Sequence, residues 1–195
     1  MKLAEVLINR KLLLIGNFVL TSGKISPYYL DLKKLPSYPE FYEVIAEAVE
    51  KVKNLDFDII VGVATGGVPI ASFIACNLRK PVGYVRLDKK GYGTNVSLEA
   101  EVKDKKVLLV DDVATTGSSL EYSIYEIAKE GGKVTATLVI IDRQEGAKKR
   151  IEKLGINFIS LYTISDILDF VINNNMIKKE DVKAIQEYLV NNLEK

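Results

Sequence analysis

The sequence predicts an α/β fold in which a mainly parallel central sheet is flanked by helices. Short runs rich in β-branched residues alternate with amphipathic helical patterns along the 195 residues. Four of the five runs are almost continuously apolar, which is typical of parallel strands buried on both faces. No repeat, low-complexity segment or linker interrupts this order. We therefore expect a single domain over residues 1–195.

The expected elements follow one another in a regular order. Strands are predicted over 58–64, 81–87, 106–113, 133–142 and 157–163. Helical patterns cover 39–55, 67–79, 118–132, 145–154, 165–174 and 179–193. The helix at 118–132 is predicted to begin with a serine cap and to stop at two glycines. The last two helices are expected to contribute packing, and nothing in their sequence predicts a further role. Ligands of such folds bind beyond the carboxyl ends of the strands, so the site is sought there.

Composition excludes several classes of function. Apolar residues make up 48% of the chain and charged residues 27%, with a formal net charge of +1. Because both signs are interspersed, no basic field indicates a nucleic-acid partner. No apolar run reaches the roughly 20 residues that cross a bilayer, so no membrane partner is expected. The N-terminus carries a charge in every turn and lacks a secretion cleavage site, which favours the cytoplasm.

The chain contains no histidine and a single cysteine, Cys76. Ser-His-Asp hydrolysis is therefore excluded, and zinc catalysis is disfavoured. Cys76 lies in the apolar run IASFIACNL, where no histidine can activate a thiol. We expect it to be a small buried apolar residue.

An acidic pair and a loop of small residues form the most informative segment, LLVDDVATTGSS at 108–119. An apolar strand runs into Asp111 and Asp112, and carboxylates at a buried strand end need a cation or hydroxyl donors. The loop Thr115–Ser119 then precedes a helix, whose first N–H groups and dipole favour an anion. Gly117 lets the backbone approach that anion closely. The segment suits a phosphate next to a vicinal diol.

Other phosphate motifs fit this segment poorly. A Walker A loop needs a lysine after its glycine, where this chain has Ser118, and the dinucleotide pattern G-x-G-x-x-G is absent. Phosphorelay receivers carry their aspartates on separate strands. A surface turn before a serine-capped helix remains an alternative, although it leaves the paired aspartates unexplained.

The segment VDDVATTGSS resembles the motif of type I phosphoribosyltransferases that binds phosphoribosyl pyrophosphate (PRPP). The resemblance implies the type I fold, with a small N-terminal hood region and a flexible loop. It also implies that the acidic pair lies by the ribose hydroxyls and that the loop holds the 5-phosphate. The implied PRPP contacts here are Asp111, Asp112, Val113, Ala114, Thr115, Thr116, Gly117, Ser118 and Ser119.

Residues 18–35, FVLTSGKISPYYLDLKKL, resemble the N-terminal segment of the orotate branch of that family. The resemblance makes residues 1–35 a hood segment over the base, with Thr21, Tyr28 and Tyr29 among the orotate contacts. A common form of the branch carries lysine where this chain has Thr21. Taken alone, the same residues would indicate a turn leading into an edge strand.

Residues 85–102 resemble the mobile catalytic loop of the same branch, here 86–102. Arg86, Lys90 and Tyr92 match its pattern as PRPP contacts, while Leu87 replaces a usual lysine. Cations suit this place because departing pyrophosphate gains negative charge. The resemblance thus assigns the catalytic roles to Lys90 and Arg86 together with the acidic pair. A solvated basic loop is the alternative.

Two further strand ends complete the predicted site. VIIDRQEGA at 139–147 matches the branch at Arg143, the residue for the orotate carboxylate, with Thr115 as a second orotate contact. An internal Asp142–Arg143 salt bridge remains the alternative. GVATGGVPIA at 62–71 resembles the loop that contacts pyrophosphate through backbone N–H groups, which makes Thr65, Gly66 and Gly67 candidates.

The resemblance as a whole implies an orotate phosphoribosyltransferase. Such an enzyme converts PRPP and orotate into orotidine 5'-monophosphate and pyrophosphate, a step of pyrimidine biosynthesis. Mg²⁺ would be held mainly through PRPP, with no direct protein ligand, and a homodimer would share the catalytic loop between subunits. The alternatives are a transferase for a purine or uracil and a non-catalytic PRPP-sensing regulator, although 17 residues before the hood motif are too few for a DNA-binding module. A ribose-phosphate diphosphokinase would be longer and duplicated.

Overall fold

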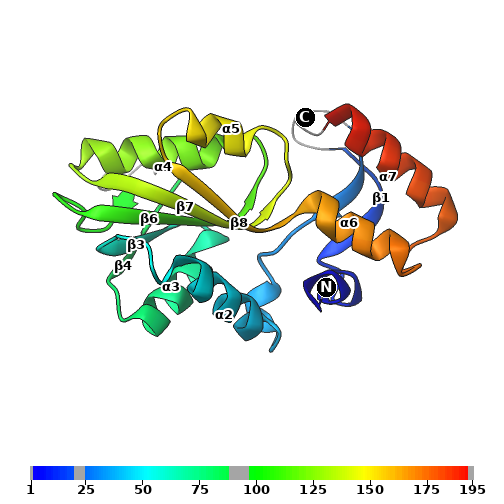
Figure 1. Cartoon of the computed structure of the whole chain (residues 1–195), viewed down its shortest axis with the longest axis horizontal. Helices are drawn as coiled ribbons and strands as arrows, with labels where there is room; N and C mark the ends of the chain where they lie inside the picture. The colour runs from blue at the N-terminus through cyan, green and yellow to red at the C-terminus, as the bar shows by residue number, and fades with distance from the viewer. Residues whose placement is uncertain (1, 20–24, 88–96, 193–195) are drawn as a thin grey trace, which may run out of the picture.

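The predicted α/β architecture is confirmed by the computed structural model, which describes residues 2–19, 25–87 and 97–192 (Figure 1). A six-stranded sheet has the order β5-β4-β3-β6-β7-β8. The strands predicted from the sequence are β3 (Ile59–Val63), β4 (Val82–Val85), β6 (Lys106–Ala114), β7 (Lys133–Asp142) and β8 (Asn157–Thr163), and all neighbours among them are parallel. The two-residue strand β5 (Leu98–Glu99) adds an antiparallel edge.

Helices cover both faces of the sheet (Figure 1). One face carries α2 (Phe41–Val52) and α3 (Gly67–Leu78), and the other carries α4 (Ser118–Lys129) and α5 (Ala147–Glu152). Side chains alternate along β6, so that Leu108 and Val110 join the hydrophobic cluster on the α2 and α3 side. Val107 and Leu109 join the cluster beneath α4 and α5. The central strand is therefore buried on both faces, as its apolar sequence requires.

A small lobe lies at one end of the sheet and combines segments that are distant in the sequence (Figure 1). It consists of α1 (Lys2–Asn9), the antiparallel hairpin of β1 (Leu13–Val19) and β2 (Ile25–Leu30), and the helices α6 (Ile164–Asn173) and α7 (Lys179–Asn192). The 3-10 helix η1 (Leu35–Ser37) leads from this lobe towards α2. The hood segment predicted at 1–35 therefore packs with the two helices to which the sequence assigned no role.

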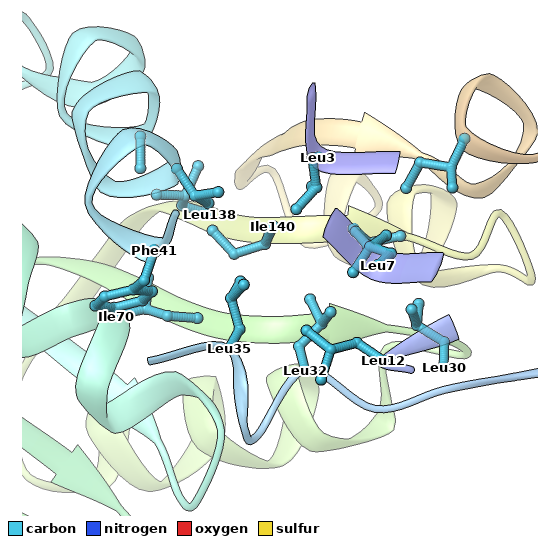
Figure 2. Close-up of a cluster of buried hydrophobic side chains, with 14 of the residues drawn as sticks. Leu3, Leu7, Leu12, Leu30, Leu32, Leu35, Phe41, Ile70, Leu138 and Ile140 are labelled. Carbon is cyan, nitrogen blue, oxygen red and sulfur yellow. The ribbon is translucent and has the colours of Figure 1, made fainter. Parts of the chain in front are cut away.

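One hydrophobic cluster continues from the small lobe into the sheet. Figure 2 shows Leu3 and Leu7 of α1 close to Ile140 of β7, with Leu12, just before β1, and Leu30 of β2 nearby. These side chains are almost fully buried. The lobe is thus fixed against the sheet by apolar packing.

Two local predictions were wrong. Cys76 is exposed, because the buried positions of α3 are 67, 70, 71, 74 and 75 and position 76 falls on the outer side of that helical stripe. No serine caps α4: its N-cap is Gly117 at φ 79°, and Ser118 and Ser119 are the first helical residues. The described part of the chain holds no helix with the length and apolar character that a bilayer crossing requires.

Candidate active site

The acidic pair lies at the carboxyl end of β6, the strand between β3 and β7. Asp111 is only 7% exposed. Its Oδ1 accepts a hydrogen bond of 2.9 Å from the Asp112 N–H, and Asp112 Oδ1 accepts one of 2.9 Å from the Val113 N–H. Because side chains alternate along a strand, Asp111 faces the loop before α4, whereas Asp112 faces Gly66 before α3.

Both carboxyl groups have a raised pKa. Burial raises the pKa of Asp111 well above its ordinary value, and the negative charge of Asp112 raises it further. Burial also raises the pKa of Asp112, although hydrogen bonds and the nearby Lys33 ammonium oppose this shift. The two carboxylates therefore have too few positive charges and donors around them when both are ionised. Hydroxyl donors or a cation bound beside them would stabilise the ionised pair.

A cup for a small anion lies beside Asp111. Its cavity of about 90 Å³ is lined by Asp111 and by the residues from Val113 to Leu120. Gly117 adopts a left-handed φ of 79°, and the Thr116 and Ser118 hydroxyls lie 2.9 Å apart. The first N–H groups of α4 have no partner within the helix, and they favour an anion at this end. The predicted loop residues from Thr115 to Ser119 are brought together here.

A larger cavity of about 650 Å³ opens at the carboxyl ends of β3 and β4, next to the start of α3. The residues that line it are Ala64, Thr65, Val68, Pro69, Tyr84, Arg86 and Leu87. The structure thus brings Thr65 together with Arg86, which forms an ion pair of 2.9 Å with Glu99. Gly66 and Gly67 pack closely on β6: a side chain at Gly66 would meet the Asp112 carboxylate, and one at Gly67 would meet the Val110 carbonyl.

Arg143 follows β7 and is tied to the β6 loop, because its N–H donates to the Ala114 carbonyl at 2.8 Å. Its side chain is buried and forms an ion pair of 2.7 Å with Glu145. The Asp142 carboxylate instead accepts a hydrogen bond of 2.8 Å from the Gln144 N–H. The alternative of an Asp142–Arg143 salt bridge therefore gives way to a pair with Glu145, which the sequence reading missed.

Tyr28 of β2 brings the small lobe to Arg143. The guanidinium carbon lies 5.0 Å from the Tyr28 ring centroid, within the range of a cation–π contact. Burial raises the pKa of Tyr28 to about 12, although the Arg143 charge opposes the shift. The ring of Tyr188, from α7, meets Tyr28 edge-on at 5.7 Å. Nothing in the sequence singled out Tyr188 beyond its place on the buried face of a helix.

Several buried polar atoms of this group lack a well-aligned hydrogen bond among the described residues. They are Tyr28 Oη, Tyr188 Oη, Arg143 Nε and Nη2, and Glu145 Oε1. The Arg143–Glu145 contact is close, but it does not have hydrogen-bond geometry. Each such atom costs about 1–3 kcal/mol when it stays unpaired. Their concentration in one place indicates a site that a polar ligand completes.

The structure ties the other residues that were predicted to contact the base less closely to Arg143. Tyr29 lies on the opposite face of β2 from Tyr28, next to Phe18 at 5.7 Å. Thr115 lines the cup, and its carbonyl accepts a hydrogen bond of 3.2 Å from the Ala147 N–H. Thr21, Lys90 and Tyr92 lie outside the described residues, so their roles stay predictions.

Lys33 is a second residue that sequence reasoning missed. It follows β2, and its ammonium forms an ion pair of 3.1 Å with Asp31. The same charge opposes the rise that burial causes in the pKa of Asp112. The described residues hold no group of three or more acidic or cysteine side chains arranged to bind a metal ion. The basic pair in DLKK was the only signal in the sequence.

Comparisons with known proteins agree on one family. Residues 32–160 match the family model described as a phosphoribosyl transferase domain. The chain is 60% identical to an orotate phosphoribosyltransferase of Saccharolobus solfataricus and 55% identical to one of Sulfurisphaera tokodaii, over the full length of each.

Solved structures give the same picture. The crystal structure of orotate phosphoribosyltransferase from Aeropyrum pernix superposes with a TM-score of 0.77 at 38% identity, covering 87% of this chain and 97% of that chain. The Mycobacterium tuberculosis enzyme in complex with PRPP superposes with a TM-score of 0.69 at 26% identity, covering 85% and 96% respectively.

Proposed function

Because this chain belongs to the orotate phosphoribosyltransferase family, we propose that it transfers the ribose 5-phosphate of PRPP to orotate. The products would be orotidine 5'-monophosphate and pyrophosphate. The observation that carries the proposal is the junction of two strand ends. The anion cup and acidic pair of β6 lie beside the buried Arg143 that follows β7, and the hydrogen bond from the Arg143 N–H to the Ala114 carbonyl joins the two.

The β6 side of the site suits PRPP. In the proposed complex the cup holds the 5-phosphate through the N–H groups at the start of α4. The ribose hydroxyls donate to Asp111 and Asp112, whose burial makes such donors favourable. The pyrophosphate would occupy the larger cavity, which Thr65 and Arg86 line. Arg86 would supply a positive charge there, and the turn of Thr65, Gly66 and Gly67 would supply backbone N–H groups.

The β7 side suits the base. The Arg143 guanidinium can meet a carboxylate with two parallel hydrogen bonds. A pyrimidine nitrogen then attacks the anomeric carbon, forming a carbon–nitrogen bond as the bond to pyrophosphate breaks, and the proton of that nitrogen is released to solvent. Arg86 and Lys90 would stabilise the departing negative charge. Positioning and electrostatics carry the rate, without a histidine as a general base.

We further propose that Mg²⁺ accompanies PRPP. The buried carboxylate pair, whose pKa values are raised, fits a cation nearby. Mg²⁺ prefers oxygen ligands and usually keeps contacts with substrate phosphates. When bound, it would neutralise charge on the pyrophosphate, while Asp111 and Asp112 orient the ribose hydroxyls.

The decisive assay measures orotate consumption with PRPP and Mg²⁺, with uracil and purines tested in parallel. Arg143→Ala should raise the orotate KM by orders of magnitude and leave the PRPP KM nearly unchanged. Arg79→Asn is a matched control, because Arg79 is exposed at the end of α3 in a left-handed conformation that Asn tolerates. An unchanged orotate KM in Arg143→Ala, or a preference for another base, would refute the proposed base site.

The homodimer with a shared catalytic loop stays a proposal, as does the cytoplasmic location. If Lys90 acts in the site of the partner subunit, mixing the inactive Lys90→Ala and Arg143→Ala proteins should restore part of the activity. Mixed dimers would then contain one site with both residues intact. Unchanged inactivity after subunit exchange would place Lys90 in its own subunit's site.

A further inference from the structure

The C-terminal helix α7 reaches the predicted base site through one side chain. Tyr188 is 8% exposed, and its ring meets Tyr28 edge-on at 5.7 Å with an interplanar angle of 84°. Tyr28 is fully buried and faces the Arg143 guanidinium at 5.0 Å. A continuous contact chain therefore runs from α7 through β2 to the strand end of β7.

Packing alone does not explain the two phenol groups. Phenylalanine would fill the same ring positions, whereas a buried hydroxyl without a partner destabilises the fold. Tyr188 Oη has no hydrogen-bond partner among the described residues, and Tyr28 Oη has none beyond its contact with the Arg143 guanidinium, whose Nε and Nη2 also lack well-aligned acceptors. Four of these atoms can donate, whereas Glu145 Oε1 is the one acceptor among the unpaired atoms around this guanidinium. The donors outnumber the acceptor, so a further acceptor would complete the group.

Glu145 explains why extra donors are needed. Its carboxylate lies 2.7 Å from the Arg143 guanidinium and already neutralises that charge. A second carboxylate entering the cluster would bring two negative charges to one positive charge. Guanidinium has five N–H donors, and neutral phenols add one each. Donor hydroxyls can therefore offset the repulsion between Glu145 and an incoming anion.

We propose that Tyr188 is a positioning residue of the base site: it holds Tyr28 against Arg143, and its hydroxyl completes the donor set for a carboxylate-bearing pyrimidine. This inference rests on the proposed function, because it takes Arg143 as the residue that meets the carboxylate of orotate. It gives the C-terminal helix a role in binding the base. The PRPP side of the site lies beyond this contact chain and does not depend on it.

The test is Tyr188→Phe in the full chain, assayed with orotate and PRPP. The substitution keeps the ring against Tyr28 and removes only the hydroxyl. We expect the orotate KM to rise about tenfold, the effect of losing about one hydrogen bond to a charged group. The PRPP KM and kcat should stay near wild-type values, and the Tm of the ligand-free protein should be unchanged or higher, because an unpaired buried hydroxyl is removed. Tyr42→Phe is the matched control, because Tyr42 is exposed on α2 and should change none of these quantities.

Two results would overturn the inference. The first is an orotate KM within twofold of wild type. The second is a rise of both KM values together with a lower Tm, which would mark Tyr188 as a packing residue only. A failure of the proposed function is recognised separately, because the wild-type protein itself would then fail to consume orotate.

Discussion

Alanine at position 66 would place a methyl group in the space that the Asp112 carboxylate occupies. A Cβ built on Gly66 lies 2.6 Å from Asp112 Oδ1 and closer still to Oδ2 and Cγ. Real Cβ atoms do not approach so closely, so the Asp112 side chain must rotate away. The backbone of residue 66 does not resist the change, because φ −66° and ψ −35° suit any L-residue.

The expected effects on activity and stability differ. A displaced Asp112 loses a charge-assisted hydrogen bond to the ribose, which is about 1.5–3 kcal/mol or roughly a 10- to 100-fold loss of kcat/KM for PRPP. Rotation also breaks its hydrogen bond to the Val113 N–H, at a cost of about 1 kcal/mol. The lower entropy of the unfolded alanine chain offsets about 0.4–1 kcal/mol of that. Stability should therefore stay nearly unchanged.

Gly155→Ala is the control for Gly66→Ala, because it should lower stability and leave activity unchanged. Gly155 has φ +74°, and no atom lies within 4 Å of the position that a Cβ would take there, so alanine meets backbone strain and no clash. That strain costs about 1 kcal/mol, which lowers the Tm of a chain of this size by about 2–4 °C. Its kcat/KM at 25 °C should equal that of wild type. Thermal melts and PRPP-dependent kinetics on both variants make the comparison.

Wild-type kcat/KM in Gly66→Ala would refute the reasoning, because the Asp112 carboxylate would then have no part in PRPP binding. A fall in Tm as large as that of Gly155→Ala, with a proportionate loss of activity, would instead mean that the turn before α3 had shifted as a whole.

Two further predictions concern the charges around the acidic pair. Because the folded pKa of Asp111 is raised, its contribution to stability is present below the ordinary carboxyl pKa and is lost as pH rises through the folded value. Asp111→Asn should therefore raise the Tm of the ligand-free protein at pH 7 and make that Tm depend less on pH, while it lowers kcat/KM for PRPP. A lower Tm would contradict this reasoning. Lys33→Met removes a cation that opposes the raised pKa of Asp112, so the acid limb of the kcat/KM profile should move to higher pH, whereas an unmoved limb would exclude Lys33 from the site.

The strands of the sheet and the β6 site could be predicted because their signals are local. Runs such as 106–113 are apolar throughout, and the acidic pair and glycine loop that follow are contiguous in the sequence. The helix boundaries differ from the predictions by only a few residues at each end, where local signals are weak. The exposed Cys76 was missed because an apolar run hides which side of α3 faces solvent.

The Arg143 cluster could be predicted only in part, because tertiary packing assembles it. Arg143 itself carries a family signature, but its partners come from separate elements: Tyr28 from β2, Glu145 from the β7–α5 turn and Tyr188 from α7. In the sequence Tyr188 is one more apolar position on an amphipathic helix. Lys33 is likewise ordinary until folding places it near Asp112.

The small lobe joins segments that a ribosome produces far apart in time. The segment from α1 to β2 emerges early, yet α6, which packs on α1, and α7, which packs on β2, begin only at Ile164. Such contacts close large loops and form slowly. The nascent chain would therefore gain its phosphate cup before its pocket for the pyrimidine. Protease clipping ahead of α7 should leave a protein that retains PRPP while losing its hold on the second substrate.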